Sequence, residues 1–561
     1  MISRQVSRLR SAALVALLVL IAAACRFEPP PRGEELARYS VLSPKDRVVG
    51  AATLWRAPGE PERWREELAV DDEKGRKVVE VRGLLSRDGE ALLRYRTRWR
   101  WEKEVESLEV WSDARSTRWR RQKGLAIERS EAPAGSQALV VATLLPTAEP
   151  GGSLALWYDL ARRLPLEGPD ELTWSGFNLR TGAPITVFIS RRERRRVEVD
   201  GRPREAVRFF VSTRASGHTV WVDAKTRELL FVDNVFGQLV RQGFARPVRQ
   251  LPERPASVVE EELKVRNGPV ELAGTLSLPR EAAAPLPAVL LVHGSGPMDR
   301  DESPLYVFRE LAHRLSALGF AVLRYDKRGV GESRFLDDEH KSSTLQDLSA
   351  DAQAWVSRLA AREGIDPDCL FTLGHSEGGI IAPLVAARDR RVAGVVTLAG
   401  PVEGLLDILP EQLDLIARAH GLPEKQLEEA RRAQAVLLRR LRSPALAPET
   451  EDLASGWLRS HAAHDPVELL RGLEAPVLGV FATGDLQVPV GQAKRLRELA
   501  KERAAPTEVQ LFDGLDHVMM DDRGGRSGIG LLSDPDRRVD PRVLDAIAAW
   551  LSNRARLRKG P

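Results

Sequence analysis

Cysteine is nearly absent from this chain of 561 residues, which contains only Cys25 and Cys369. Two cysteines so far apart in the sequence exclude a disulfide framework and a CxxC type of metal or redox site. Cys369 precedes the apolar run Leu370–Leu373, so we expect it to be a small, buried hydrophobic residue.

A large net charge is also missing. The chain has 84 basic and 80 acidic residues and a formal net charge of only +4, so it offers no electrostatic case for a nucleic-acid partner. The densest basic run, residues 191–196, precedes the alternating pair Val197 and Val199 and is interpreted as the solvated turn of a hairpin. Hydrophobic content of 43% and charged content of 29% are typical of a globular protein, and the length predicts two or three domains.

Long apolar segments are missing except near the N-terminus. There, three arginines within the first ten residues precede the apolar stretch Ala12–Ala24. That stretch is too short to span a bilayer and predicts a signal peptide over residues 1–24. Ala22 and Ala24 satisfy the small-residue rule of an ordinary signal peptidase.

The same segment resembles a bacterial lipoprotein box, in which Cys25 would be lipidated and become the first mature residue. Ala22 stands where that box usually has leucine. Residues 25–33, rich in proline, would then be a tether. This interpretation predicts an exported protein anchored to a membrane of the bacterial cell envelope, whereas ordinary cleavage would give a periplasmic or secreted one.

Residues 34–250 consist of short runs in which apolar and polar residues alternate, as in Ile185–Ile189 and His218–Asp223. Alternation with period two predicts a mainly antiparallel β domain, interrupted by one helix over roughly Leu154–Leu164. The turn between Trp221 and Leu229 resembles hairpins of periplasmic lipoprotein-type β-clam domains. The role of this region stays open between binding a lipid or the cell envelope and acting as a passive spacer.

A linker that contains prolines, residues 251–257, separates this region from one in which strands and helices alternate. Such alternation predicts a mostly parallel α/β sheet. Residues 402–470 break the pattern with charged, helical sequence, so we expect this domain to comprise residues 258–401 and 471–555. The domain is expected to begin with a hairpin of the strands Val258–Val265 and Val270–Leu278. The strands predicted after it are Ala288–Val292, Phe320–Tyr325, Cys369–Leu373, Gly394–Leu398, Pro476–Phe481 and Glu508–Phe512.

The stretch Gly374–Gly379, GHSEGG, has the pattern G-x-S-x-G between a predicted strand and a predicted helix. In that context the serine occupies a strained turn, and a side chain at position 374 or 378 would collide with the crossing elements. Ser376 is therefore a candidate nucleophile. The alternative is a structural serine in a glycine turn.

A serine hydroxyl needs a base to accept its proton. His517 follows the strand Glu508–Phe512, so we expect it at the carboxyl edge of the sheet. His420, His461 and His464 lie in the helical insertion, and we expect them away from that edge. His461 and His464 could face one metal ion, but no third ligand is evident. His375 is interpreted as a packing or supporting residue.

The base in turn needs an acid to orient it. Asp485 follows an apolar strand and precedes His517 in the chain, in the order Ser, acid, His that is expected with a G-x-S-x-G turn. Asp513 and Asp516 are rivals. They share the loop of His517, so they cannot easily reach around its ring.

The loop His293–Glu302, HGSGPMDRDE, follows the strand Ala288–Val292. A phosphate loop would need a lysine and a following serine or threonine, and a metal site would need further ligands at suitable spacing. The remaining interpretation is a loop that turns backbone N–H groups toward an oxyanion. Asp299, Arg300 and Asp301 are then expected to form ion pairs that fix the loop.

Taken together, these motifs resemble the α/β-hydrolase superfamily, and within it a bacterial esterase group close to the dienelactone-hydrolase and serine-aminopeptidase-like branches. The resemblance covers residues 258–553, leaves the upstream region unmatched, and departs at Asp516, where related enzymes often have asparagine. The matching pieces are His293–Pro297 with Asp299–Asp301, Tyr325–Ser333, Gly374–Gly379, Gly484-Asp485 with Val488-Pro489, and Leu515–His517.

The resemblance implies an α/β-hydrolase fold with a catalytic triad of Ser376, Asp485 and His517. It also implies oxyanion donors from the backbone N–H groups of Ser295 and Glu377, with no cofactor and no metal. The insertion 402–470 would be a helical cap, whose apolar residues line the substrate pocket or merely form its packing face.

The expected reaction is hydrolysis of a small-molecule carboxylic ester. A peptidase, amidase or thioesterase of the same fold is the alternative within enzymes. A lipoprotein that binds the envelope and carries a vestigial hydrolase domain is the rival from another class. The sequence does not predict the oligomeric state.

Overall fold

The computed structural model describes residues 34–559 except for 43–47, 58–61, 72–76, 89–90, 102–103, 113–115, 124–125, 134–138, 142–153, 179–183, 215, 235–236, 247–250, 282–284, 338–342, 420–421, 423, 443–452 and 527. The expected export segment, the tether and Cys25 lie outside the described residues. The chain divides into two compact units, one ending at Pro247 and the other comprising Arg214–Gly217 and Val248–Pro561.

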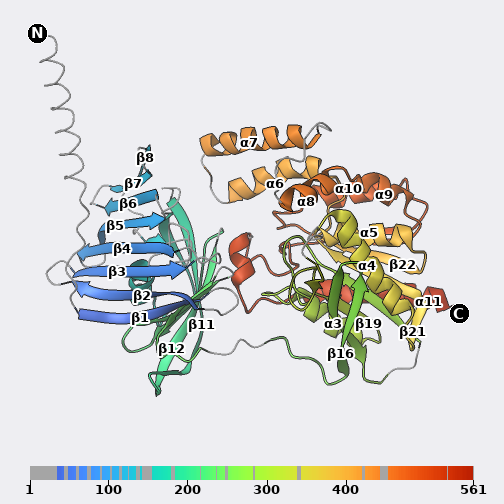
Figure 1. Cartoon of the computed structure of the whole chain (residues 1–561), viewed down its shortest axis with the longest axis horizontal. Helices are drawn as coiled ribbons and strands as arrows, with labels where there is room; N and C mark the ends of the chain where they lie inside the picture. The colour runs from blue at the N-terminus through green and yellow to red at the C-terminus, as the bar shows by residue number, and fades with distance from the viewer. Residues whose placement is uncertain are drawn as a thin grey trace, which may run out of the picture. The chain divides into compact units, whose positions relative to one another are not determined.

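The N-terminal unit contains a fifteen-stranded sheet (Figure 1) in the order β8-β7-β6-β5-β4-β3-β2-β1-β15-β14-β13-β12-β11-β10-β9. The sheet is mainly antiparallel, as predicted, although β9 pairs parallel with β10. Its strands are β1 (Glu34–Leu42), β2 (Val48–Ala57), β3 (Glu62–Asp71), β4 (Lys77–Asp88), β5 (Ala91–Trp101), β6 (Glu104–Ser112), β7 (Ser116–Lys123), β8 (Ala126–Pro133), β9 (Leu139–Val141), β10 (Glu171–Asn178), β11 (Pro184–Val199), β12 (Arg202–Ser212), β13 (Gly217–Asp223), β14 (Leu229–Asn234) and β15 (Gly237–Arg241).

The alternation that predicted these strands divides their side chains between two faces of the sheet. Val220 and Val222 join the main core of this unit, whereas Trp221 belongs to a second cluster. Helix α2 (Leu154–Arg163) covers the main core with Trp157 and Leu160, which are both buried. The alternation of residues along each strand therefore corresponds to the two faces of the sheet.

The basic run at residues 191–196 is not the predicted turn. It lies within the 16-residue strand β11, where Arg191 is opposite Phe209, and the turn comes later at Asp200 and Gly201, which both have positive φ. The guanidinium group of Arg195 lies 4.9 Å from the ring centre of Trp221. Stacking on aromatic rings lets arginine occupy strand positions that sequence alone assigns to solvent.

The second unit contains a nine-stranded sheet in the order β16-β17-β19-β18-β21-β22-β23-β24, with β20 paired to β17. Neighbouring strands from β19 to β24 are parallel, and β16 and β17 are antiparallel. The prediction of a mostly parallel sheet is confirmed. The strands are β16 (Val258–Asn267), β17 (Val270–Pro279), β18 (Leu286–Val292), β19 (Ala321–Tyr325), β20 (Arg334–Phe335), β21 (Ile365–His375), β22 (Val392–Leu398), β23 (Val477–Ala482) and β24 (Thr507–Phe512).

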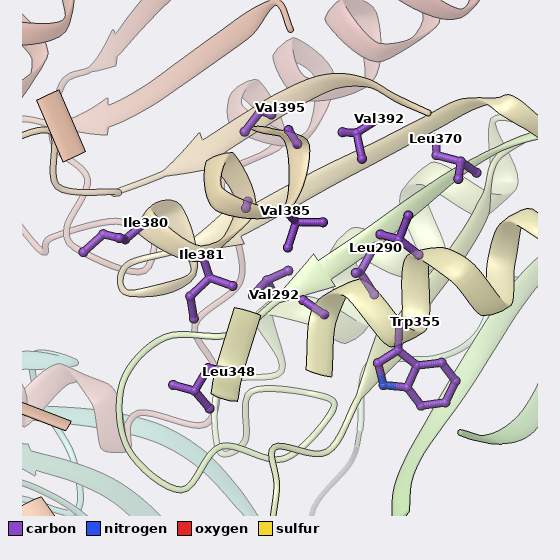
Figure 2. Close-up of a cluster of buried hydrophobic side chains, with 14 of the residues drawn as sticks. Leu290, Val292, Leu348, Trp355, Leu370, Ile380, Ile381, Val385, Val392 and Val395 are labelled. Atoms are coloured by element: carbon purple, nitrogen blue, oxygen red, sulfur yellow. The ribbon is translucent and has the colours of Figure 1, made fainter. Parts of the chain in front are cut away.

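Both faces of this sheet are covered by helices. Along β18, Leu290 and Val292 join a core with α4 (Leu345–Ala360), α5 (Gly378–Arg388) and α10 (Gly491–Ala500), while Val289 and Leu291 join a core with α3 (Val307–Ala317) and α11 (Pro541–Lys559). Figure 2 shows the first core, with Trp355 of α4 beside the strands. A parallel strand buried on both faces needs a continuous apolar run, which is why these strands were readable in the sequence.

Four helices lie between β22 and β23, in the segment expected to form a cap. They are α6 (Leu405–Ala419), α7 (Glu424–Arg442), α8 (Leu453–Ala462) and α9 (Pro466–Gly472). Helices α6, α7 and α8 pack against one another (Figure 1). In the part of the chain that the structure describes, no helix has the length and apolar character needed to cross a membrane.

Candidate active site

Ser376 occupies the tight turn between β21 and α5. Its φ of +54° is in the left-handed region, which costs a non-glycine residue free energy and occurs preferentially at functional sites. A Cβ atom on Gly374 would lie 1.9 Å from the carbonyl oxygen of Gly378, and one on Gly378 would lie 2.0 Å from that of Val292. The glycines of the motif are therefore required by the crossing of β18, β21 and α5.

Asp485 and His517 come together from the ends of two neighbouring strands, β23 and β24. The Nδ1 atom of His517 lies 2.8 Å from Oδ2 of Asp485, and both side chains are buried. The other oxygen, Oδ1, accepts hydrogen bonds from the backbone N–H groups of Gln487 and Val488 at 2.8 and 2.9 Å. The carboxylate is thus fixed on one side and holds the imidazole on the other.

His375, directly before Ser376, connects the turn between β21 and α5 to the loop that contains His517. Its Nε2 lies 3.1 Å from the carbonyl oxygen of His517, and the two rings are 5.0 Å apart. Its Nδ1 lies 3.1 Å from Glu302. Burial lowers the pKa of His375, but the negative charge of Glu302 outweighs it and the pKa is raised. The predicted supporting role of His375 therefore takes the form of a buried bridge.

The loop after β18 passes beside Ser376, so close that a Cβ on Gly294 would lie 3.2 Å from Cβ of Ser376. The N–H of Gly294 donates to Oε1 of Glu302, and its carbonyl oxygen accepts from Nζ of Lys327. His293 donates from Nε2 to the carbonyl oxygen of Tyr325 at 2.6 Å, and burial lowers its pKa to about 4. Ser295 follows as an exposed residue.

Comparison with known proteins also identifies a hydrolase in the second unit. Residues 283–524 match the family model described as serine aminopeptidase, S33. The chain is 31% identical to Esterase EstD of Thermotoga maritima over 302 residues, which are 53% of this chain and 68% of the esterase. The chain belongs to the α/β-hydrolase family.

Two further proteins are similar to part of the chain. The α/β-hydrolase is 27% identical to the putative hydrolase YtaP of Bacillus subtilis over 210 residues, 34% of this chain and 69% of that protein. A solved esterase structure from Pyrococcus furiosus is 16% identical, covers 55% of this chain and 97% of its own, and has a TM-score of 0.37. The sequence relatives support a hydrolase activity.

The side chain of Glu377, which follows the candidate nucleophile Ser376 of this α/β-hydrolase, is buried among charged and polar groups. Its Oε2 lies 2.7 Å from Nζ of Lys327, while Nε2 of His461 lies 2.9 Å from Oε1 and the indole N–H of Trp457 also donates to Oε1. Burial raises the pKa of Glu377, but the hydrogen bond from His461 and the charge of Lys327 outweigh it and hold the pKa at about 2. The carboxylate is therefore ionised at neutral pH.

His461 corrects the prediction that the histidines of the insertion lie away from the carboxyl edge. Helix α8 brings this residue to Glu377, next to Ser376, although 84 positions separate His461 from Glu377 in the sequence. His464 forms no such contact in the structure, and His420 lies outside the described residues. In the described part of the chain, no group of three or more His, Cys, Asp or Glu side chains has the arrangement of a metal site.

The other acidic residues of these loops have structural partners. Asp516 pairs with Arg537 at 2.7 Å and accepts from the backbone of Val518 in its own loop. The expected ion pairs exist for Arg300, which binds Asp326, and for Asp301, which binds Arg324. Asp299 differs from the prediction, because its Oδ1 accepts from the backbone N–H groups of Asp301 and Ser303 and no ion pair is described for it.

Proposed function

We propose that this α/β-hydrolase cleaves carboxylic esters through an acyl-enzyme, with Ser376 as nucleophile, His517 as general base and Asp485 as the acid that orients it. The observation that carries the proposal is the 2.8 Å contact from Asp485 to Nδ1 of His517, in a loop that is hydrogen-bonded to the residue preceding Ser376. A proton on Nδ1 leaves Nε2 free to accept the proton of the serine hydroxyl.

The tetrahedral intermediate needs two hydrogen-bond donors for its oxyanion. We assign these to the backbone N–H groups of Glu377, at the start of α5, and of Ser295, in the loop beside Cβ of Ser376. No metal or organic cofactor enters the proposed reaction. In the second half-reaction His517 activates a water molecule that hydrolyses the acyl-enzyme.

An ester substrate fits the charges of the site better than a peptide with a free N-terminus. An aminopeptidase needs a carboxylate that is free to bind the ammonium group of its substrate. The buried carboxylates of Glu377, Asp485 and Asp516 each pair with a basic side chain of the protein. That of Glu302 lies beside Nδ1 of His375 at 3.1 Å. The match to the serine aminopeptidase family keeps the aminopeptidase as the second candidate, with an amidase or a thioesterase beside it.

The test compares the full chain with the variant Ser376→Ala. We expect the wild type to hydrolyse p-nitrophenyl acetate and the variant to lose that turnover while keeping the same melting temperature. Full activity in Ser376→Ala would refute the proposal. Higher kcat/KM for aminoacyl anilides than for p-nitrophenyl esters would favour the aminopeptidase, and an inactive wild type would favour a binding protein with a vestigial hydrolase domain.

We also propose that the protein is exported and anchored in the bacterial cell envelope through a lipidated Cys25, and that α6–α9 form the cap over the substrate pocket. The support for export is the charged and apolar pattern of residues 1–24 with alanine before the cysteine. Cys25→Ala should release the protein from the membrane fraction if lipid alone retains it. Retention of the variant in that fraction would contradict the lipid anchor.

A further inference from the structure

Lys327 is a buried lysine placed between the two segments that supply the proposed oxyanion donors. It lies two residues after β19, and only 8% of its side chain is exposed. Its Nζ donates to the carbonyl oxygen of Gly294 at 2.9 Å and to Oε2 of Glu377 at 2.7 Å. Its backbone N–H donates to the carbonyl oxygen of Met298, farther along the same loop. Lys327 therefore contacts both segments that supply the proposed oxyanion donors.

The contact with Gly294 fixes the direction of the next N–H group. The carbonyl of residue 294 and the N–H of Ser295 belong to one planar, trans peptide unit, so they point in opposite directions. A lysine that holds the oxygen on one side turns the N–H of Ser295 to the other side. The neighbouring peptide is held as well, because the N–H of Gly294 donates to Glu302 at 3.1 Å.

Such restraint is needed because glycine has the widest choice of backbone conformations. An oxyanion donor contributes to catalysis only if it is oriented before the charge develops. A buried ion pair is weak evidence for stability, since the desolvation of both charges offsets most of their attraction. The position of the Lys327–Glu377 pair, between the donors, points instead to a role in orientation.

The pair also has a connection to the insertion. The second oxygen of Glu377 faces helix α8, from which Trp457 donates its indole N–H and His461 brings Nε2 to 2.9 Å. The Nδ1 of His461 donates to the carbonyl oxygen of Trp457 at 2.9 Å, which orients its ring. Helix α8 therefore contacts the carboxylate that holds Lys327.

We propose that Lys327, held by Glu377 and through it by Trp457 and His461 of α8, is a positioning residue that orients the N–H of Ser295 toward the oxyanion. The proposal rests on the proposed function of Ser376. It makes the docking of α8 a condition for a fully formed oxyanion hole. Removing the contact between Lys327 and the carbonyl oxygen of Gly294 should therefore slow the chemical step and leave ground-state binding of the substrate nearly unchanged.

The first test uses Lys327→Met in the full chain, with Lys501→Met as the matched control, because Lys501 is an exposed lysine paired only with Glu498. We expect kcat for p-nitrophenyl acetate to fall by about 10- to 100-fold in Lys327→Met, with KM changed less than about threefold. Affinity for a boronic acid, whose serine adduct is tetrahedral, should fall by a similar factor. The control should match the wild type.

The double variant Lys327→Met/Glu377→Gln separates orientation from the effect of an unpaired buried charge. It removes both charges and keeps every backbone N–H, so its melting temperature should recover toward that of the wild type while kcat stays low. Recovery of kcat together with stability would overturn the proposal, and so would a wild-type kcat in Lys327→Met. Activity in Ser376→Ala would instead refute the proposed function itself, so the two failures are distinguishable.

The link to α8 has its own variant. Trp457→Phe keeps an aromatic ring but removes the indole N–H that donates to Glu377, together with part of the ring. We expect kcat and boronic-acid affinity to fall together by about 3- to 10-fold, in the same direction as in Lys327→Met. An increase in KM with unchanged kcat and boronic-acid affinity would show that Trp457 affects substrate binding alone, and would remove α8 from the proposal.

Discussion

The substitution Asp485→Asn tests the orientation of His517 with almost no change in shape. In the wild type, Oδ1 accepts two backbone N–H groups, from Gln487 and Val488, and Oδ2 faces Nδ1 of His517 at 2.8 Å. Only an acceptor can serve the two backbone donors, so the oxygen of asparagine must take the place of Oδ1. Its NH₂ group then points at Nδ1 of His517, which must become an acceptor.

The consequence is the wrong tautomer of the histidine. With Nδ1 accepting, the proton of the neutral ring lies on Nε2, the atom that should receive the proton of Ser376. A loss of about 10⁴-fold in kcat is the expected cost of this exchange. KM should change little. The new amide forms the same number of hydrogen bonds as the carboxylate did, so the melting temperature should stay near that of the wild type.

The assay is continuous hydrolysis of p-nitrophenyl acetate, with thermal unfolding of each variant measured in the same buffer. Asp513→Asn is the matched control, because Asp513 precedes His517 in the same loop but is exposed. It should retain wild-type kcat. A loss of less than tenfold in Asp485→Asn, or an equal loss in Asp513→Asn, would refute the assignment of Asp485 as the orienting acid.

Two further substitutions test packing and burial. Gly378→Ala should destabilise the second unit by more than about 3 kcal/mol, because the added Cβ would lie 2.0 Å from the carbonyl oxygen of Val292. Gly472→Ala is the control, since a Cβ there would have no atom within 4 Å. Equal melting temperatures of the two variants would contradict this prediction. Burial raises the pKa of Glu310 to about 7, so its ionisation costs stability as pH rises from about 4.5 through 7. Glu310→Gln should therefore melt higher than the wild type at pH 8 and not at pH 4.5; a gain that is independent of pH would contradict it.

The parts of the site that follow strands of the parallel sheet were predictable from the sequence. Ser376, Asp485 and His517 each come soon after an apolar run, and parallel strands bring their carboxyl ends to one edge. The glycines at positions 374 and 378 are required by the local crossing of the chain, so the short sequence motif was enough to predict them. Alternating apolar residues likewise predicted the antiparallel sheet of the N-terminal unit.

The supporting groups were not predictable, because they depend on how distant segments pack. His461 and Trp457 lie in an insertion without strand periodicity, and nothing in the sequence states that α8 turns back to Glu377. Lys327 stood inside the motif Tyr325–Ser333, yet only the structure shows that its ammonium group reaches Gly294. The arginine run in β11 misled the prediction for a similar reason, since the aromatic ring that Arg195 stacks on comes from β13.

The central claim, that Ser376 is a nucleophile activated by His517, is tested most directly by reaction of the full chain with a fluorophosphonate. We expect one adduct per chain, located on Ser376 by mass spectrometry. It should form much more slowly in His517→Ala and be absent in Ser376→Ala. A wild-type chain that stays unlabelled while p-nitrophenyl acetate is hydrolysed, or an adduct on another residue, would contradict it.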